Sequence, residues 1–309
     1  FFFKQKTAYE MCGRDWSSDV CSSDLDFIGK QALLKLNKDK IKKNKVCTDC
    51  QNFSLMTSLK KSIPQIKSST EPFYDSRIIK DQTEIKILKK ASKIIDEMFE
   101  LCTKKIKENQ KESELQTILM TYAMENQMFD TGYKSTLNPL IIAGGPNGAL
   151  PHAQVTQRKF RKGDLIVVDI TLRYKGYVSD ATRTFGLGTV STKAKEAYEI
   201  VQESQKLGLN AVKSNVSCKD VDLACRNLIQ EKNYGDFFIH STGHGIGLEV
   251  HELPTISFKN EAKLKENMAI TVEPGIYIPN KFGIRIEDSL IVNKKATVMH
   301  KFTKDLLLL

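Results

Sequence analysis

The stretch LIVVDITLRYKGYVSDATRTFGL (165–187) contains two apolar, β-branched segments on either side of Lys175-Gly176. Two such segments separated by a short turn containing glycine predict a β-hairpin. If Lys175 and Gly176 form a two-residue turn, Tyr174 lies opposite Tyr177, and this pairing sets the register of the whole hairpin.

Two aspartates of this hairpin, Asp169 and Asp180, have mainly apolar or β-branched neighbours. Because side chains alternate along a strand, the predicted register places both aspartates on one face, in diagonal positions. A buried carboxylate needs a partner that offsets the loss of its hydration. We therefore favour a shared metal ion over two exposed acids.

Histidine is rare in this chain, with 5 in 309 residues, and three of them occur in HSTGHGIGLEVHELP (240–254). The alternating glycines around His244 disfavour a helix and predict a strand approached closely by another backbone. In a regular strand His244 and His251 would point to opposite faces, so a shared site requires a bend between them. A phosphate-binding loop is disfavoured because the glycine spacing does not match GxGxxG.

Two glutamates complete a candidate ligand set. Glu273, in ITVEPGIY (270–277), precedes Pro-Gly, which ends regular strand pairing. Glu287, in GIRIEDS (283–289), follows Arg285 by two residues, so that Arg285 lies on the same strand face as a natural partner behind a ligand. Together with two aspartates and one histidine, these acids suit two divalent ions of manganese, cobalt, iron or zinc.

The periodicity of the remaining chain predicts an α+β fold. Asp81 with Glu84, and Ser113 with Gln116, have the spacing of capping boxes before apolar residues at helical intervals. The other predicted elements are strands at 139–144 and 165–185, helices at 192–213 and 217–232, and mainly strands over 237–298. The order of helices, strands, helices and strands indicates two halves of similar content.

The N-terminal region has a different character. KQKTAYEM (4–11) and DWSSDVCSSDL (15–25) look like translated sequencing adapter, so we expect residues 1–25 to be non-native. We expect residues 26–80 to be the remnant of a truncated N-terminal domain with its linker, and residues 81–309 to form the catalytic domain.

The composition excludes several classes of protein. The net charge is +10, but the lysine-rich stretch KLNKDKIKKNK (35–45) has no interleaved aromatic residues, so we expect a solvated surface and no nucleic-acid partner. No apolar run approaches the length of a membrane span. Cysteines without a secretory leader predict a reducing cytoplasm. Cys47 and Cys50 have zinc or redox spacing, but no second pair accompanies them, and we expect no such role.

The ordered segments VVDI, YVSDATRTF, HSTGHGIGLEVHE, TVEPGIY and GIRIED resemble the pita-bread-fold metallopeptidases, in the Xaa-Pro aminopeptidase and prolidase branch. The resemblance covers about residues 80–309. It implies two pseudo-symmetric α+β halves around a dinuclear metal site. The implied metal ligands are Asp169, Asp180, His244, Glu273 and Glu287, with Asp180 and Glu287 bridging both ions.

The resemblance also implies roles for side chains that contact the substrate. His251 would stabilise the tetrahedral intermediate, His152 would contact the substrate near the scissile bond, and His240 would line the proline pocket. Glu273 would be the proton shuttle as well as a ligand. These residues would form the catalytic and substrate-binding set, with Arg285 supporting the ligands from behind.

The implied activity is removal of the N-terminal residue from peptides with proline in second position, by a hydroxide that bridges two divalent ions, with manganese the first expectation. An Xaa-Pro dipeptidase, which requires a free carboxylate on the proline, is the alternative. Relatives carry an N-terminal domain that shapes the entrance and often a dimer contact, so a homodimer and an impaired fragment acting only as a binding module both stay open. The complete ligand set disfavours creatinase-like enzymes, and LEVHELP disfavours methionine aminopeptidases.

Overall fold

The computed structural model describes residues 47–48, 53–69, 71–129 and 140–309. The adapter-like segment and Cys50 lie outside the described residues. Contacts divide the chain into residues 1–77 and 78–309. The described elements that begin in the first part are β1 (Cys47–Thr48), α4 (Phe53–Ser62), β2 (Lys67–Ser68) and α5 (Glu71–Ile78). The second part carries the candidate site.

Residues 78–309 begin with a half in which two helices cover a sheet. Its elements are α6 (Gln82–Lys105), α7 (Glu112–Glu125), β3 (Met128–Phe129), β4 (Leu140–Gly144), η1 (Gly145–Ala149), β5 (Leu165–Tyr174) and β6 (Tyr177–Gly186). Strand β5 pairs antiparallel with β3, β4 and β6. Apolar residues of α6 and α7 pack with those of the sheet in one buried cluster that includes Phe99, Leu115 and Val168.

The helix starts of this half confirm one expectation and correct another. Asp81 caps α6 in a capping box with Glu84, as predicted. The second helix begins at Glu112 instead of after Ser113, because Glu114 and not Gln116 accepts the hydrogen bond from the backbone N–H of Lys111.

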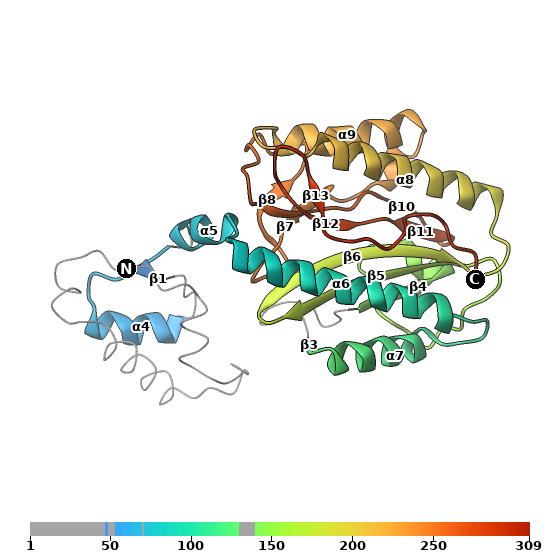
Figure 1. Ribbon diagram of the computed structural model, residues 1–309, viewed down its shortest axis with the longest axis horizontal. Helices are drawn as coiled ribbons and strands as arrows, with labels where there is room; N and C mark the ends of the chain where they lie inside the picture. Colours follow the sequence, from blue (N-terminus) through green and yellow to red (C-terminus); the bar gives the residue numbers. More distant parts are fainter. Residues whose placement is uncertain (1–46, 49–52, 70, 130–139) are drawn as a thin grey trace. The chain divides into compact units, whose positions relative to one another are not determined.

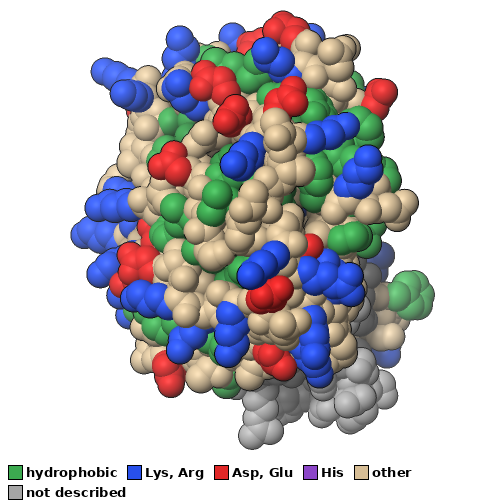
Figure 2. Space-filling view, turned by 90° about the vertical axis from the view of Figure 1, so that its right-hand side faces the viewer, with side chains coloured by type: hydrophobic (Ala, Val, Ile, Leu, Met, Phe, Trp, Pro, Cys, Tyr) green, Lys and Arg blue, Asp and Glu red, His purple; other side chains and the backbone are tan. Residues whose placement is uncertain are grey.

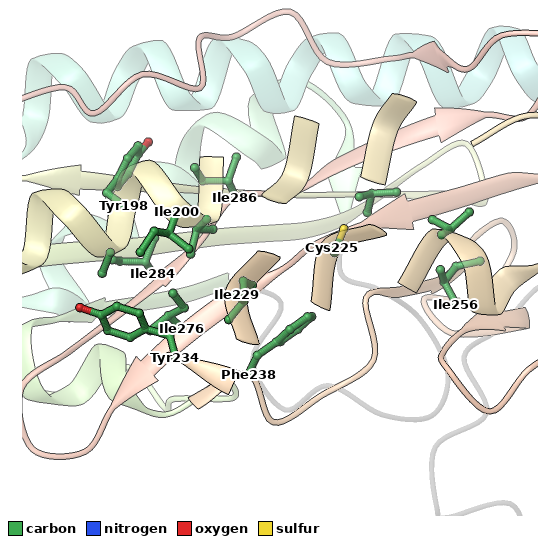
Figure 3. Close-up of a cluster of buried hydrophobic side chains, with 14 of the residues drawn as sticks. Tyr198, Ile200, Cys225, Ile229, Tyr234, Phe238, Ile256, Ile276, Ile284 and Ile286 are labelled. Atoms are coloured by element: carbon green, nitrogen blue, oxygen red, sulfur yellow. The ribbon is translucent and has the colours of Figure 1, made fainter. Parts of the chain in front are cut away.

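The second half repeats the pattern of two helices and strands. Its elements are α8 (Thr192–Ala211), α9 (Cys218–Glu231), η2 (Gly235–Phe237), β7 (Gly243–Gly245), β8 (Glu252–Ile256), β9 (Ala269–Val272), β10 (Gly275–Ile278), β11 (Phe282–Arg285), β12 (Asp288–Ile291) and β13 (Thr297–Val298). The main sheet has the order β13-β12-β9-β7-β8, and β10 pairs with β11. Figure 3 shows the core of this half, where Ile200 and Ile229 on the helices face Ile276 and Ile284 on the strands.

The two halves meet along β6 and the segment that joins β11 to β12. The backbone N–H of Glu287 donates to Thr182 O at 3.1 Å. Arg183, which is 2% exposed, forms a buried ion pair with Asp288 at 2.7 Å. In Figure 1, α6 and α7 lie on one side of the strands and α8 and α9 on the other, so the strands of both halves fill the middle. This arrangement is the α+β pita-bread fold predicted from the sequence.

The surface in Figure 2 carries lysine and arginine side chains interspersed with aspartate and glutamate, without a continuous basic stripe on that face. In the part of the chain that the structure describes, no helix has the length and apolar character needed to cross a bilayer.

Candidate metal centre

The β5–β6 hairpin has the predicted register. Tyr174 pairs with Tyr177 around Lys175 and Gly176, both of which have positive φ. Asp180 lies opposite Thr171, so Asp169 and Asp180 occupy diagonal positions on one face.

Thr171 lies between the two aspartates. Its Oγ1 is 2.8 Å from Asp180 Oδ1 and 3.3 Å from Asp169 Oδ1. A hydroxyl group has one proton to donate. Thr171 therefore satisfies only one of these oxygens at a time, and both carboxylates retain acceptor capacity for another group.

His244 lies in β7 between two glycines, where the backbone of neighbouring segments approaches closely. A Cβ on Gly243 would lie 2.1 Å from Thr271 O, and one on Gly245 would lie 2.3 Å from Leu253 O, so only glycine fits on either side of His244. The ring Nδ1 of His244 is 3.0 Å from Gly245 O, which makes Nδ1 the donor to that carbonyl. This contact directs Nε2 toward the acids, as is usual for metal-binding histidines.

Glu273 and Glu287 extend from chain segments between strands. Glu273 follows the end of β9, and its Oε1 lies 3.3 Å from His244 Nε2. Glu287 joins β11 to β12, and its Oε2 accepts a hydrogen bond from Thr182 Oγ1 at 2.6 Å. The second oxygen, Oε1, is buried and has no hydrogen-bond partner among the described residues. An unpaired buried carboxylate oxygen is costly and marks a place where a ligand fits.

Three of these groups converge tightly enough to hold one ion. Ligand atoms of Asp180, His244 and Glu287 all lie within 4.8 Å of one another, and all three residues are buried. Asp169 and Glu273 lie beside this cluster, since Asp169 contacts Thr171 and Glu273 contacts His244. The structure thus brings together all five residues that the sequence analysis proposed as ligands. Carboxylate oxygens with one imidazole nitrogen are a donor set that suits divalent ions.

The pKa values of the clustered acids are those expected of a site that binds a cation. Burial and the charge of Asp169 raise the pKa of Asp180 well above its usual range, and burial and the charge of Asp180 do the same for Glu287. Burial by itself would lower the pKa of His244, but its hydrogen bond to Glu273 and the negative charges of Glu273 and Asp180 together outweigh that effect and raise the pKa to about 9. Without a cation, Asp180 and Glu287 therefore tend to hold protons, whereas the hydrogen bond and charge of His244 keep the pKa of Glu273 low, at about 2.

Arg285 contacts a different acid from the one expected. Its Nη2 lies 2.5 Å from Asp169 Oδ2, whereas it reaches Glu287 only through Thr182, to whose Oγ1 its Nε donates at 3.0 Å. Arg285 Nη1 also donates to Tyr277 Oη at 2.7 Å. The sequence indicated a partner on the same strand, but strand packing between the two halves places Asp169 in front of the guanidinium group.

The histidines that the sequence assigned to substrate lie around this cluster. The ring of His251 is 4.4 Å from that of His244, because a register shift between His244 and Gly245 provides the required bend. His240 contacts Ser241 O through Nδ1 at 2.8 Å and Tyr277 Oη through Nε2 at 3.0 Å. His152 is exposed in the turn after η1. Burial is the largest cause that lowers the pKa of His240 and His251, and the nearby His152 makes the smallest contribution to each.

Desolvation is the main cause of these lowered values. It lowers the pKa of His240, and together with the charge of His244 it lowers that of His251 to about 4. Both rings are therefore neutral near neutral pH, and each has one N–H to donate.

The sequence reasoning missed the hydroxyl groups that orient the acids. Thr171, Thr182 and Tyr277 are buried and hydrogen-bond to the candidate ligands or to Arg285. A signal for them was present, since Thr171 and Thr182 each lie two residues after one of the two aspartates, on the same strand face.

Comparison with known proteins places this chain among peptidases. The model of metallopeptidase family M24 matches residues 86–294. An Xaa-Pro dipeptidase of Pyrococcus horikoshii is 40% identical over 251 residues, which cover 79% of this chain and 69% of the relative.

Two solved structures share the fold. An Xaa-Pro dipeptidase from Bacillus anthracis has a TM-score of 0.82 at 36% identity, over 95% of this chain and 80% of the other. An X-Pro aminopeptidase from Thermotoga maritima has a TM-score of 0.82 at 31% identity, over 93% of this chain and 79% of the other.

Proposed function

The chain belongs to metallopeptidase family M24, and from this premise we propose that it is an Xaa-Pro dipeptidase, which hydrolyses the bond before a C-terminal proline. The observation that carries the proposal is the buried convergence of Asp180, His244 and Glu287, flanked by Asp169 and Glu273. The names of relatives support the dipeptidase over the aminopeptidase expected from the sequence, since similar proteins of Pyrococcus horikoshii and Pyrococcus furiosus are both Xaa-Pro dipeptidases.

The proposed metal ligands are Asp169, Asp180, His244, Glu273 and Glu287. The orphaned Oε1 of Glu287 and the raised pKa values of Asp180 and Glu287 support a divalent cation here. When bound, two divalent ions would polarise the scissile carbonyl and make water a nucleophile near neutral pH. Manganese is our first proposal for their identity, because hard oxygen donors predominate.

The chain's own side chains would bind the substrate and handle protons. The neutral His251 has an N–H available to the developing oxyanion, and the exposed His152 would reach the substrate from the other side. Glu273 would carry a proton at Oε1 toward the leaving proline nitrogen. Both ring nitrogens of His240 already contact Ser241 and Tyr277, so His240 would offer the proline its ring surface.

Xaa-Pro aminopeptidase activity is the second candidate. The observation in its favour is the equal TM-score of 0.82 with the X-Pro aminopeptidase from Thermotoga maritima. The two activities differ in whether the chain may continue beyond proline.

The experiment that separates them offers the manganese-loaded chain an Xaa-Pro dipeptide and an Xaa-Pro-Yaa tripeptide in parallel. Cleavage of the dipeptide alone supports the dipeptidase, and cleavage of the tripeptide replaces it with the aminopeptidase. If neither peptide is cut while metal is bound, both activities are wrong; if no metal binds, the ligand assignment is wrong. The Glu287→Gln variant serves as the inactive control against a contaminating peptidase.

A further inference from the structure

Glu112, the first residue of α7, is fully buried but lies outside the metal centre. Its carboxylate accepts four hydrogen bonds: from Gly144 N, Asn147 Nδ2, Thr156 N and Thr156 Oγ1, at 2.9, 2.9, 2.9 and 2.6 Å. All the donors belong to the segment 144–156, which we call the His152 loop because it carries His152. A single carboxylate therefore accepts hydrogen bonds from the start, the first turn and the end of that loop.

This carboxylate is neutralised by dipoles alone. Among the described residues, no lysine or arginine forms an ion pair with Glu112, so its charge is stabilised by the loop's own N–H and O–H groups. Of the four hydrogen bonds, one ends on Oε1 and three end on Oε2 of the carboxylate. Hydrogen bonds to a buried charge are short and strong, and removing the charge would leave buried donors unpaired. The loop therefore has one strongly preferred arrangement.

The tip of the His152 loop has a separate attachment. Arg285, which also pairs with Asp169, donates from Nη1 to Pro151 O at 3.1 Å. The neighbouring Leu150 is 59% exposed, and His152 is exposed too. Few packing contacts are available to such exposed side chains, so the two polar attachments, Glu112 at the base and Arg285 at the tip, help the buried Ala153 to fix where His152 points.

We propose that Glu112 is a positioning residue that acts on catalysis through His152. The proposal rests on the proposed peptidase function only for its kinetic readout. Loss of the Glu112 charge would loosen the His152 loop at its base while the metal ligands, which are supplied by other segments, stay in place. Misplacing a catalytic group by about 1 Å can cost about 100-fold in rate, so the effect falls on kcat.

The first test is Glu112→Gln, which preserves shape but replaces one acceptor oxygen with an amide donor facing the loop's donors. We expect kcat to fall between about 10- and 100-fold, with KM changed far less and manganese affinity unchanged. The matched control is Asp96→Asn, which changes another buried carboxylate that accepts a backbone N–H, from Lys301 at 2.6 Å, far from this loop in the chain. We expect the control to keep the wild-type kcat.

A double-mutant cycle with His152→Ala distinguishes positioning from general damage. If Glu112 acts through His152, Glu112→Gln changes kcat by less than about twofold in the His152→Ala background. A full-sized loss in both backgrounds overturns the proposal. Thr156→Val, which removes the 2.6 Å hydroxyl donor to Glu112 and the acceptor of the Arg158 N–H, is the milder variant to use if Glu112→Gln does not fold. Its smaller loss of kcat must also vanish with His152→Ala.

A second readout does not need activity. Amide hydrogen exchange of residues 145–156 and the imidazole NMR signals of the protein's 5 histidines report the loop directly. We expect faster exchange in this segment and a shifted His152 signal in Glu112→Gln but not in Asp96→Asn. If the wild-type chain cleaves no Xaa-Pro peptide but this loosening occurs, the proposed function fails while the anchoring of His152 stands; unchanged exchange and an unchanged signal overturn the anchoring itself.

Discussion

Lys80 and Glu252 form a buried ion pair between residues 172 positions apart, with Lys80 Nζ 3.1 Å from Glu252 Oε2. The other oxygen of Glu252 accepts the backbone N–H groups of Leu248 and Glu249 at 2.9 and 3.1 Å. This single carboxylate closes the turn between β7 and β8, and the turn carries His251. Lys80, two residues before the start of α6, therefore helps to shape the histidine-containing segment of the other half.

Lys80→Met should destabilise the fold strongly. The variant leaves Glu252 buried without its cation, and breaking a buried pair from one side costs roughly 3–5 kcal/mol. Urea denaturation measures the change in the free energy of unfolding. The control, Lys206→Met, breaks the exposed pair of Lys206 with Glu203 and should cost less than about 1 kcal/mol. Equal costs in the two variants would show that the buried pair has no special role.

Thr171→Val should weaken metal binding with little effect on stability. The substitution keeps the shape of the side chain but removes the hydroxyl group between Asp169 and Asp180. Loss of a group that orients metal ligands lowers affinity by about 10- to 100-fold. Calorimetric titration with Mn²⁺ measures the change, and Thr121→Val, at an exposed helical position, provides the control. If Thr171→Val bound Mn²⁺ with wild-type affinity, Thr171 would have no role in orienting the metal ligands.

Metal binding should release protons and should strengthen as pH rises. The pKa values of Asp180 and Glu287 are raised, so in the metal-free protein both groups hold protons at pH values where ordinary carboxyls are ionised. A metal ion must displace these protons, and also the one on His244, whose pKa is about 9. Titration calorimetry with Mn²⁺ near pH 7, in two buffers of different ionisation enthalpy, counts the protons released. An identical heat in both buffers would contradict the expectation.

Gly243→Ala should damage both the fold and the site. An added Cβ would lie 2.1 Å from Thr271 O, which is backbone of β9 and cannot move without breaking the sheet. We expect a loss of more than about 2 kcal/mol in the free energy of unfolding, together with weaker Mn²⁺ binding through displacement of His244. Gly235→Ala is the control, since its nearest atoms would lie 3.3–3.4 Å away. Similar thermal midpoints for the two variants would rule out the close approach.

Much of the fold was predictable because its signals are local. The length of the Lys175-Gly176 turn set the hairpin register, and the residues Asp81 and Glu84 set the start of α6. The segments around Asp180, His244 and Glu287 were specific enough to indicate the family. The start of α7 was predicted wrongly, because Glu114, two positions closer to the helix start than Gln116, accepts the backbone N–H of Lys111.

The sequence by itself determined which chemical groups are present and which side of each strand they occupy, because alternation, turn length and capping depend on neighbouring residues. Only the tertiary structure decided which groups meet. Packing between the halves turned Arg285 toward Asp169, and the register shift after His244 brought His251 onto the same site. The partners of the buried charges of Lys80, Glu252 and Glu112 are also set by the tertiary structure. A charge removed from water needs a partner, and the folded chain decides which group lies beside it.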